Sequence, residues 1–160
     1  MLFPHVSAVD YVDLVTTSKG TSEQLNLIFQ AQANDEKIYQ IRPPLAPKEI
    51  AQFHTLLTKS SLTGKFTISH EFLLVFSERN RIVGGLFWKP MESERIHLEW
   101  VAIKQKSRGI NLSKILLEDF FKRMSHQNIK IITVGFYVEK FFSKHGFKLN
   151  KRYGGLVKKL

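Results

Sequence analysis

Residues 95–124, RIHLEWVAIKQKSRGINLSKILLEDFFKRM, contain the three successive elements that decide the fold of this chain. The first nine residues, Arg95–Ile103, are rich in β-branched and aromatic side chains and predict a strand. Residues 104–111 form a polar loop with one glycine. Beyond it, apolar residues recur at helical spacing, namely Leu112, Ile115, Leu116, Phe120 and Met124. The stretch therefore predicts a strand that leads through a short turn directly into an amphipathic helix.

Upstream, the pattern predicts a strand over residues 37–42 and a helix over residues 48–59 with one apolar face. A hairpin of two strands, residues 71–77 and 81–88, follows with its turn at residues 78–80. Together with Arg95–Ile103, these segments predict three consecutive strands in the middle of the chain.

Downstream, residues 129–134 predict a strand and residues 139–144 a short helix that ends at Gly146. Residues 147–153 and 156–160 predict a closing hairpin. The order of elements indicates an α/β or α+β fold, in which helices cross over between strands of one sheet.

Residues 1–36 have a different pattern and are interpreted as an N-terminal extension of a domain that covers residues 37–160. Within this extension, Ser22 is placed to cap a helix over residues 23–33. The apolar stripe of that helix would consist of Leu25, Ile28 and Phe29.

Composition limits the class of protein. A length of 160 residues suits one domain with a sizeable core. The chain has no cysteine, which excludes disulfides and thiolate chemistry. No apolar run reaches the ~20 residues that cross a bilayer, and no export signal opens the sequence, so we expect a cytoplasmic protein without a membrane partner.

The net charge of +10 is concentrated in the second part of the chain. Residues 1–100 carry 10 Lys and Arg against 11 Asp and Glu, whereas residues 101–160 carry 14 against 3. This basic part favours an anionic ligand, either a nucleotide-like cofactor, an acidic protein or a nucleic acid. A solvated lysine surface is the alternative interpretation.

The turn from Arg108 to Ser113 is the strongest candidate for an anion site. Backbone N–H groups converge at a helix N-terminus, where the helix dipole also attracts negative charge. Arg108 adds a cationic donor, so the turn suits a pyrophosphate. The alternative is a tight connection capped by Asn111 or Ser113.

Two motifs resemble those of the GNAT N-acetyltransferase superfamily. Residues 103–113, IKQKSRGINLS, are similar to its acyl-CoA-binding motif, with Arg108 at the first position, Asn111 in place of the first glycine and Ser113 in place of the last small residue. Residues 141–147, FFSKHGF, resemble its Phe-Tyr-x-Lys-x-Gly-Phe run. The order of elements from residue 37 onward also matches, so the resemblance covers about three quarters of the chain.

This resemblance implies a mixed, mostly antiparallel sheet flanked by helices. The sheet would splay between the family's fourth and fifth strands, here Arg95–Ile103 and residues 129–134. The cosubstrate would be acetyl-CoA, with no metal. Its pantetheine would follow the backbone of Val101, Ala102 and Ile103. Its pyrophosphate would lie on the N–H groups of the turn, contributed by Arg108, Gly109, Ile110, Asn111, Leu112 and Ser113.

The resemblance also implies catalytic residues. The family's bases commonly project from the strand before the cofactor loop, where Glu99 and His97 stand two residues apart. Its usual acid is the Tyr of the Phe-Tyr pair, but that position holds Phe142, which has no proton to give. Tyr137, close by in sequence, is the substitute that we expect.

The activity implied is transfer of an acetyl group from acetyl-CoA to an amine of a small molecule or peptide, by direct attack assisted by a general base. The alternative is a non-catalytic module of the same fold that binds CoA or an anionic partner. A nucleic-acid partner is not expected, and a homodimer is left open.

Overall fold

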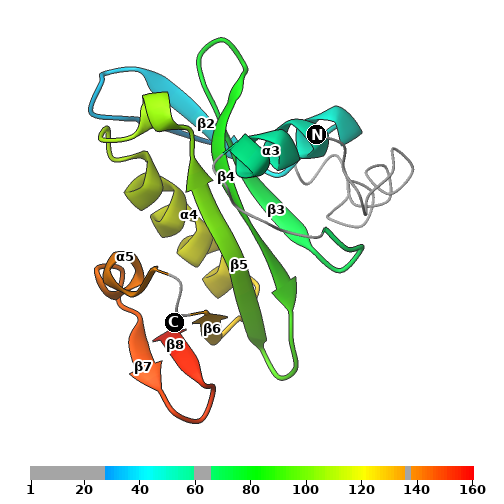
Figure 1. Cartoon of the computed structure of the whole chain (residues 1–160), viewed down its shortest axis with the longest axis vertical. Helices are drawn as coiled ribbons and strands as arrows, with labels where there is room; N and C mark the ends of the chain where they lie inside the picture. The colour runs from blue at the N-terminus through cyan, green and yellow to red at the C-terminus, as the bar shows by residue number, and fades with distance from the viewer. Residues whose placement is uncertain (1–27, 60–65, 136–137) are drawn as a thin grey trace.

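The computed structural model describes residues 28–59, 66–135 and 138–160. Their strands form a single sheet in the order β1-β2-β3-β4-β5-β6-β8-β7 (Figure 1). The strands are β1 (Phe29–Gln32), β2 (Ile38–Arg42), β3 (Glu71–Phe76), β4 (Ile82–Pro90), β5 (Arg95–Ile103), β6 (Ile131–Val134), β7 (Lys148–Asn150) and β8 (Gly155–Lys159). Every neighbouring pair of these strands is antiparallel except β5 and β6.

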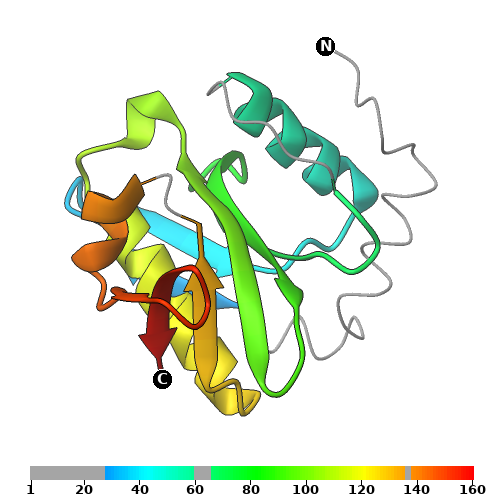
Figure 2. The same ribbon diagram turned by 60° about the horizontal axis from the view of Figure 1, so that its bottom comes forward.

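Helices cover both faces of the sheet (Figures 1 and 2). Helix α3 (Pro47–Lys59) lies on one face, and α4 (Leu112–His126) and α5 (Glu139–Ser143) lie on the other. A 3-10 turn, η1 (Gln105–Ser107), stands between β5 and α4. The predicted mixed, mostly antiparallel sheet flanked by helices is thus confirmed, and no described helix is long and apolar enough to cross a membrane.

The two faces of the sheet bury two separate apolar clusters. Helix α3 contributes Ile50, Phe53 and Leu57 to a phenylalanine-rich cluster. Helix α4 places Leu116 and Phe120, both fully buried, in the larger cluster on the opposite face. Burial of this kind is the main favourable term in folding, so the two clusters fix the sheet rigidly between its helices.

The predicted N-terminal helix over residues 23–33 is wrong where the structure describes it. Residues Phe29–Gln32 form β1, and Phe29 pairs with Ile41 in an antiparallel ladder. A helical stripe of three apolar residues is a weak signal, because pairing with β2 satisfies the same backbone groups within the sheet. Residues 1–27 lie outside the described part, so the boundary at residue 36 stays a prediction, although β1 itself belongs to the sheet.

Strand β5 pairs with β6 along only half of its length. The parallel register runs from Arg95, opposite Ile131, to Leu98, opposite Val134. On its other side β5 stays paired with β4 as far as Ile103, opposite Gly84. The second half of β5 therefore separates from β6, as Figure 1 shows. The predicted splay between these two strands is confirmed.

A β-bulge at Glu99 separates the two halves of β5. Phe87 of β4 stands opposite Trp100, and Trp88 stands opposite Leu98, so Glu99 is an extra residue in the ladder. A bulge of this kind interrupts the alternation of side chains between the two faces of a strand.

The bulge changes which side chains of β5 share a face. Strict alternation would place His97 and Glu99 on the same face as Val101 and Ile103. Instead, Val101 and Ile103 pack with Leu98 in the α4-side cluster. His97 and Glu99 do share a face, but it is the α3 side, where Glu99 contacts a histidine that precedes β3. The polar side chains His97 and Glu99 thus lie on the α3 face, which they share with Trp100 and Ala102, whereas Val101 and Ile103 face α4.

Candidate active site

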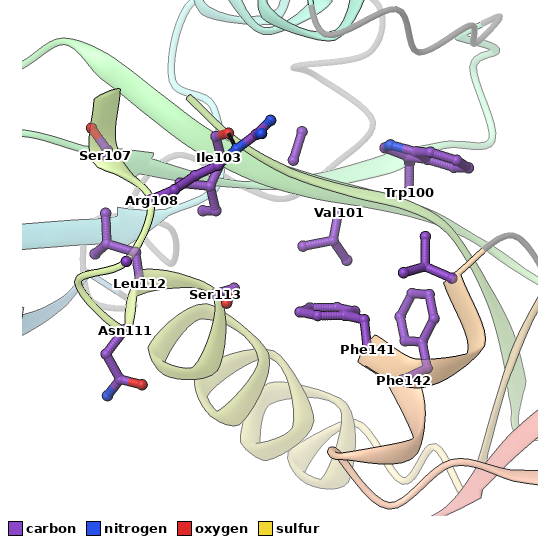
Figure 3. Close-up of a pocket in the computed structure, with 13 residues that line it drawn as sticks. Trp100, Val101, Ile103, Ser107, Arg108, Asn111, Leu112, Ser113, Phe141 and Phe142 are labelled. Carbon is purple, nitrogen blue, oxygen red and sulfur yellow. Dashed lines mark hydrogen bonds between the residues drawn. The ribbon is translucent and has the colours of Figure 1, made fainter. Parts of the chain in front are cut away.

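A cavity of about 480 Å³ opens where β5 leaves β6 (Figure 3). One wall is the unpaired half of β5, and the other walls are the turn before α4 and the helix α5. The structure brings eight of the nine predicted cofactor residues to this cavity, namely Val101, Ala102, Ile103, Arg108, Gly109, Asn111, Leu112 and Ser113. Ile110 does not line it. Its side chain packs against the core, and its carbonyl accepts a hydrogen bond from the Asn34 N–H at 3.1 Å.

The turn before α4 is shaped by two residues with positive φ. Gly109 has φ of 82°, and Asn111, the residue that precedes the helix, has φ of 73° and ψ of 15°. Asn is among the few non-glycine residues that adopt this left-handed conformation readily. Asn111 makes no side-chain capping bond, and Figure 3 shows its amide turned away from the cavity. The first N–H groups of α4 lack intrahelical partners and therefore suit an anion.

Arg108 ties this turn to the end of β5. Its Nε donates a hydrogen bond to the Ile103 carbonyl at 3.0 Å, which keeps the guanidinium at the mouth of the cavity. On its other side, Arg108 borders a second hollow that also contains Lys59, Lys104 and Lys106. Arg108 lines both hollows, whereas the three lysines line the second and not the first. The basic part of the sequence thus contributes to the site itself.

The opposite end of the cavity is apolar. The sequence motifs did not assign its lining residues to a cofactor site. Trp100, Val138, Phe141 and Phe142 line it, and Val101 of β5 faces Phe141 of α5. Phe142 is only 1% exposed and packs against Phe141 and Phe147, with ring centroids 5.1 and 5.2 Å apart. The cavity is therefore polar and basic at the turn before α4, and it is apolar near Glu99.

Glu99 stands one residue before the cavity lining begins and is held by a buried histidine. His70, 4% exposed, places its Nε2 2.7 Å from Glu99 Oε2. His97 places its Nε2 3.5 Å from Glu99 Oε1. Both carboxylate oxygens of Glu99 thus have a histidine nitrogen nearby. Sequence reasoning missed His70, because 29 residues separate it from Glu99.

The cluster keeps both candidate bases unprotonated near neutral pH. The hydrogen bond from His70 lowers the pKa of Glu99 below its ordinary 4.5, and this outweighs the opposing effect of burial. Burial lowers the pKa of His97 below 6.5, against the attraction of Glu99. Both groups can therefore accept a proton at pH 7.

His97 is anchored on its other nitrogen. Its Nδ1 lies 2.9 Å from Thr133 Oγ1, on the neighbouring strand β6. Arg95 Nη1 donates to the same hydroxyl at 3.2 Å, and the hydroxyl in turn lies 3.3 Å from the Ile96 carbonyl. The paired half of β5 thus fixes the imidazole. Tyr137, the predicted acid, lies outside the described residues, and its role stays a prediction.

Comparison with known proteins identifies the family. The family model of the acetyltransferase (GNAT) domain matches residues 41–153, most of the chain. The chain belongs to the GNAT acetyltransferase family. No curated protein sequence is significantly similar to this GNAT domain.

Solved structures with this fold are numerous and distant in sequence. The GNAT domain of S. lividans PAT superposes with a TM-score of 0.66 at 10% identity, covering 84% of this chain and 98% of that one. A GNAT-family acetyltransferase from Staphylococcus aureus Mu50 gives 0.60 at 15% identity, over 76% and 99%. One from Elizabethkingia anophelis, determined with acetyl-CoA bound, gives 0.54 at 16%, over 76% and 98%. At such identities the likeness establishes the fold alone.

Proposed function

We propose that this GNAT domain transfers an acetyl group from acetyl-CoA to the amine of a small molecule or peptide, with Glu99 as general base. The observation that carries the proposal is the position of Glu99 at the bulge of β5. It stands where the paired, polar half of the strand meets the open half that lines the cavity.

The cavity residues fit the cosubstrate in type and order. Amide-bearing pantetheine can take the place of β6 beside Val101–Ile103, because the register of β6 ends at Leu98 and no other described strand pairs with that edge. The N–H groups at the start of α4, with Arg108, suit the pyrophosphate. The apolar end near Trp100 and Phe141 would surround the acetyl group and exclude water from the thioester.

The residues on the α3 face supply the chemistry for the acceptor. The amine nitrogen attacks the thioester carbonyl carbon, its proton passes to Glu99 directly or through water, and the C–S bond breaks to release the CoA thiolate. His97 is the second candidate for the base, because its imidazole is neutral near pH 7 and faces the same space as the Glu99 carboxylate.

The acid step does not involve residue 142. Phe142 has no ionisable proton and lies in the core. A thiol has an ordinary pKa near 8.5, so CoA is an acceptable leaving group as the thiolate, which solvent or Tyr137 then protonates.

The test combines binding and turnover. CoA present at about 100 times its dissociation constant should stabilise the fold by about 2.7 kcal/mol, which thermal unfolding detects as a shift of a few degrees. Acetyl-CoA is then incubated with a panel of small amines and peptides, and CoA release and acetylated product are measured together.

The two readouts separate the alternatives. Binding together with transfer supports the enzyme. Binding without transfer to any amine would favour a non-catalytic GNAT module that binds CoA. An absence of any thermal shift at millimolar CoA would overturn the cofactor assignment itself.

A further inference from the structure

We propose that His70 is a positioning residue for Glu99: its imidazole donates to Oε2 and so fixes the orientation of the carboxylate at the β5 bulge. This inference rests on the proposed function, because it concerns the same general base. It adds a residue that neither the motifs nor the cavity lining identifies.

The hydrogen bonds of His70 define its tautomer. The backbone N–H of Thr67 donates to His70 Nδ1 at 2.9 Å. A nitrogen that accepts from a backbone N–H carries no proton of its own, so the ring proton of neutral His70 is on Nε2. That proton points at Glu99 Oε2, 2.7 Å away. His70 is therefore a donor to Glu99 and does not compete with it for the amine's proton.

The surroundings of His70 make it a rigid donor. The side chain is 4% exposed, and its ring packs edge-on to Phe87 with centroids 5.1 Å apart. The His70 N–H donates to the Thr67 carbonyl at 3.0 Å, which closes the turn that leads into β3. Because both ring nitrogens and the ring face are fixed, the position of Nε2 is set by the core.

Glu99 needs such a partner because it occupies a bulge. The register with β4 passes from Leu98 to Trp100, so the strand pairing alone does not determine where the Glu99 carboxylate points. The titratable groups that face it are His70 before β3, His97 on β5 and Lys89 on β4. With Oε2 bound to His70, Oε1 lies 3.5 Å from His97 Nε2, so the two candidate bases stand side by side.

The experiment uses two variants of His70 and one matched control. His70→Gln keeps an amide N–H donor within reach of Glu99, whereas His70→Phe keeps a planar ring and removes the donor. His54→Phe is the control, because His54 is also buried and its ring packs edge-on to Phe66 at 5.0 Å. Thermal stabilisation by CoA shows which variants retain the fold.

The first readout requires no acceptor. Nitrogen-15 spectra of the wild type should show that His70 is protonated on Nε2 and unprotonated on Nδ1. Carbon-13 titration of the Glu99 carboxyl should show its pKa rising in His70→Phe, remaining nearer the wild-type value in His70→Gln, and unchanged in His54→Phe. A proton on His70 Nδ1 would overturn the proposal, as would a Glu99 pKa that is unaltered in whichever His70 variant folds.

The second readout is kinetic and uses the acceptor found by the amine panel. Loss of a hydrogen bond to a charged group should lower kcat about 10- to 100-fold in His70→Phe, with the KM for acetyl-CoA unchanged and the acidic limb moved to higher pH. His70→Gln should recover most of the rate. Equal losses in both variants and in His54→Phe would mean that His70 only supports the core.

The two proposals fail in different ways. If the wild type binds CoA but transfers nothing, the proposed function fails, while the spectra still decide whether His70 holds Glu99. If transfer occurs and the His70 variants shift neither the carboxyl titration nor the pH profile, the positioning role alone fails.

Discussion

The two halves of β5 differ in what they present to a ligand. From Arg95 to Leu98 the strand is paired on both edges, with β4 and with β6. From Trp100 to Ile103, β4 is the strand that pairs with it among the described residues, and this half borders the cavity. Glu99, the bulged residue, separates the halves and turns its side chain to the α3 face.

The two halves therefore contribute different groups to the site: side chains from the paired half and backbone from the open half. In the paired half the sheet uses the backbone groups, so only side chains such as His97 remain for chemistry. In the open half the strand borders the cavity and its side chains are apolar, which suits a cofactor that is held by its amides. Changes in the first half should therefore alter turnover, and changes in the second half should alter cofactor affinity.

The largest effect is expected from Glu99→Gln, at the bulge between the two halves. Turnover should fall by about 10²–10⁴-fold, the range for loss of a general base. CoA affinity should hardly change, because the cofactor would contact the backbone beyond this residue. Steady-state kinetics beside calorimetric CoA titration measure both quantities. Full activity in this variant would remove Glu99 from the mechanism.

The pH–rate profile identifies which of the two bases acts. A base must be unprotonated, so the rate falls as the pH drops through its pKa. If Glu99 is the base, the acidic limb lies below pH 4.5, because His70 lowers the pKa of Glu99. If His97 is the base, the limb lies below pH 6.5, because burial lowers the pKa of His97. His97→Gln should abolish the limb only in the second case.

Two adjacent glycines of β4 point toward opposite faces of the sheet. Substitution of each tests whether the cavity side alone affects CoA binding. A Cβ on Gly84 would lie 2.6 Å from Ile103 Cδ1 and 2.7 Å from the Ala102 carbonyl oxygen, in the open half. A Cβ on Gly85 would lie 2.9 Å from Phe53 and from the Leu73 carbonyl oxygen, on the α3 side.

Each substitution by Ala overpacks the core at a cost of about 1–3 kcal/mol in the free energy of unfolding. Urea unfolding should show this loss for both variants. Only Gly84→Ala should also weaken CoA binding, because it displaces the cavity wall. Equal CoA affinities for the two variants would contradict the assignment of this wall to the cofactor.

A smaller effect is expected at Asn111, at the end of the cavity beyond the open half. Its left-handed backbone costs an ordinary residue about 1–2 kcal/mol, but costs glycine nothing. Asn111→Gly should therefore preserve or improve CoA binding, whereas Asn111→Val should impair it. Calorimetric titration with CoA compares the two. If the Asn111→Val variant binds CoA as tightly as the wild type, the turn does not bind the phosphates.

The smallest effect is expected at Arg108, which is exposed. An exposed ion pair contributes about 0.2–1 kcal/mol, so Arg108→Ala should weaken CoA binding up to about fivefold. A pantetheine fragment without phosphates should bind the two proteins alike. An equal loss for both ligands would mean that Arg108 acts mainly through its hydrogen bond to Ile103.

Local sequence patterns determined much of the molecule. Arg95–Ile103 was predicted with its true limits, and the helix from Leu112 begins where its apolar spacing begins. Both are long elements whose periodicity is repeated several times, so the pattern is unambiguous. Asn111 stands where the motif has a glycine, and its left-handed backbone reflects a preference that belongs to the residue itself.

Tertiary structure decided the rest, since it depends on contacts between distant parts of the chain. The strand at Phe29 forms because β2 offers an edge, the bulge at Glu99 arises from register with β4, and His70 reaches Glu99 across 29 residues. No local pattern encodes these pairings. The sequence by itself therefore determined the family, the order of elements and the cofactor turn, whereas only the packed sheet decided which face of β5 carries the base and what holds it there.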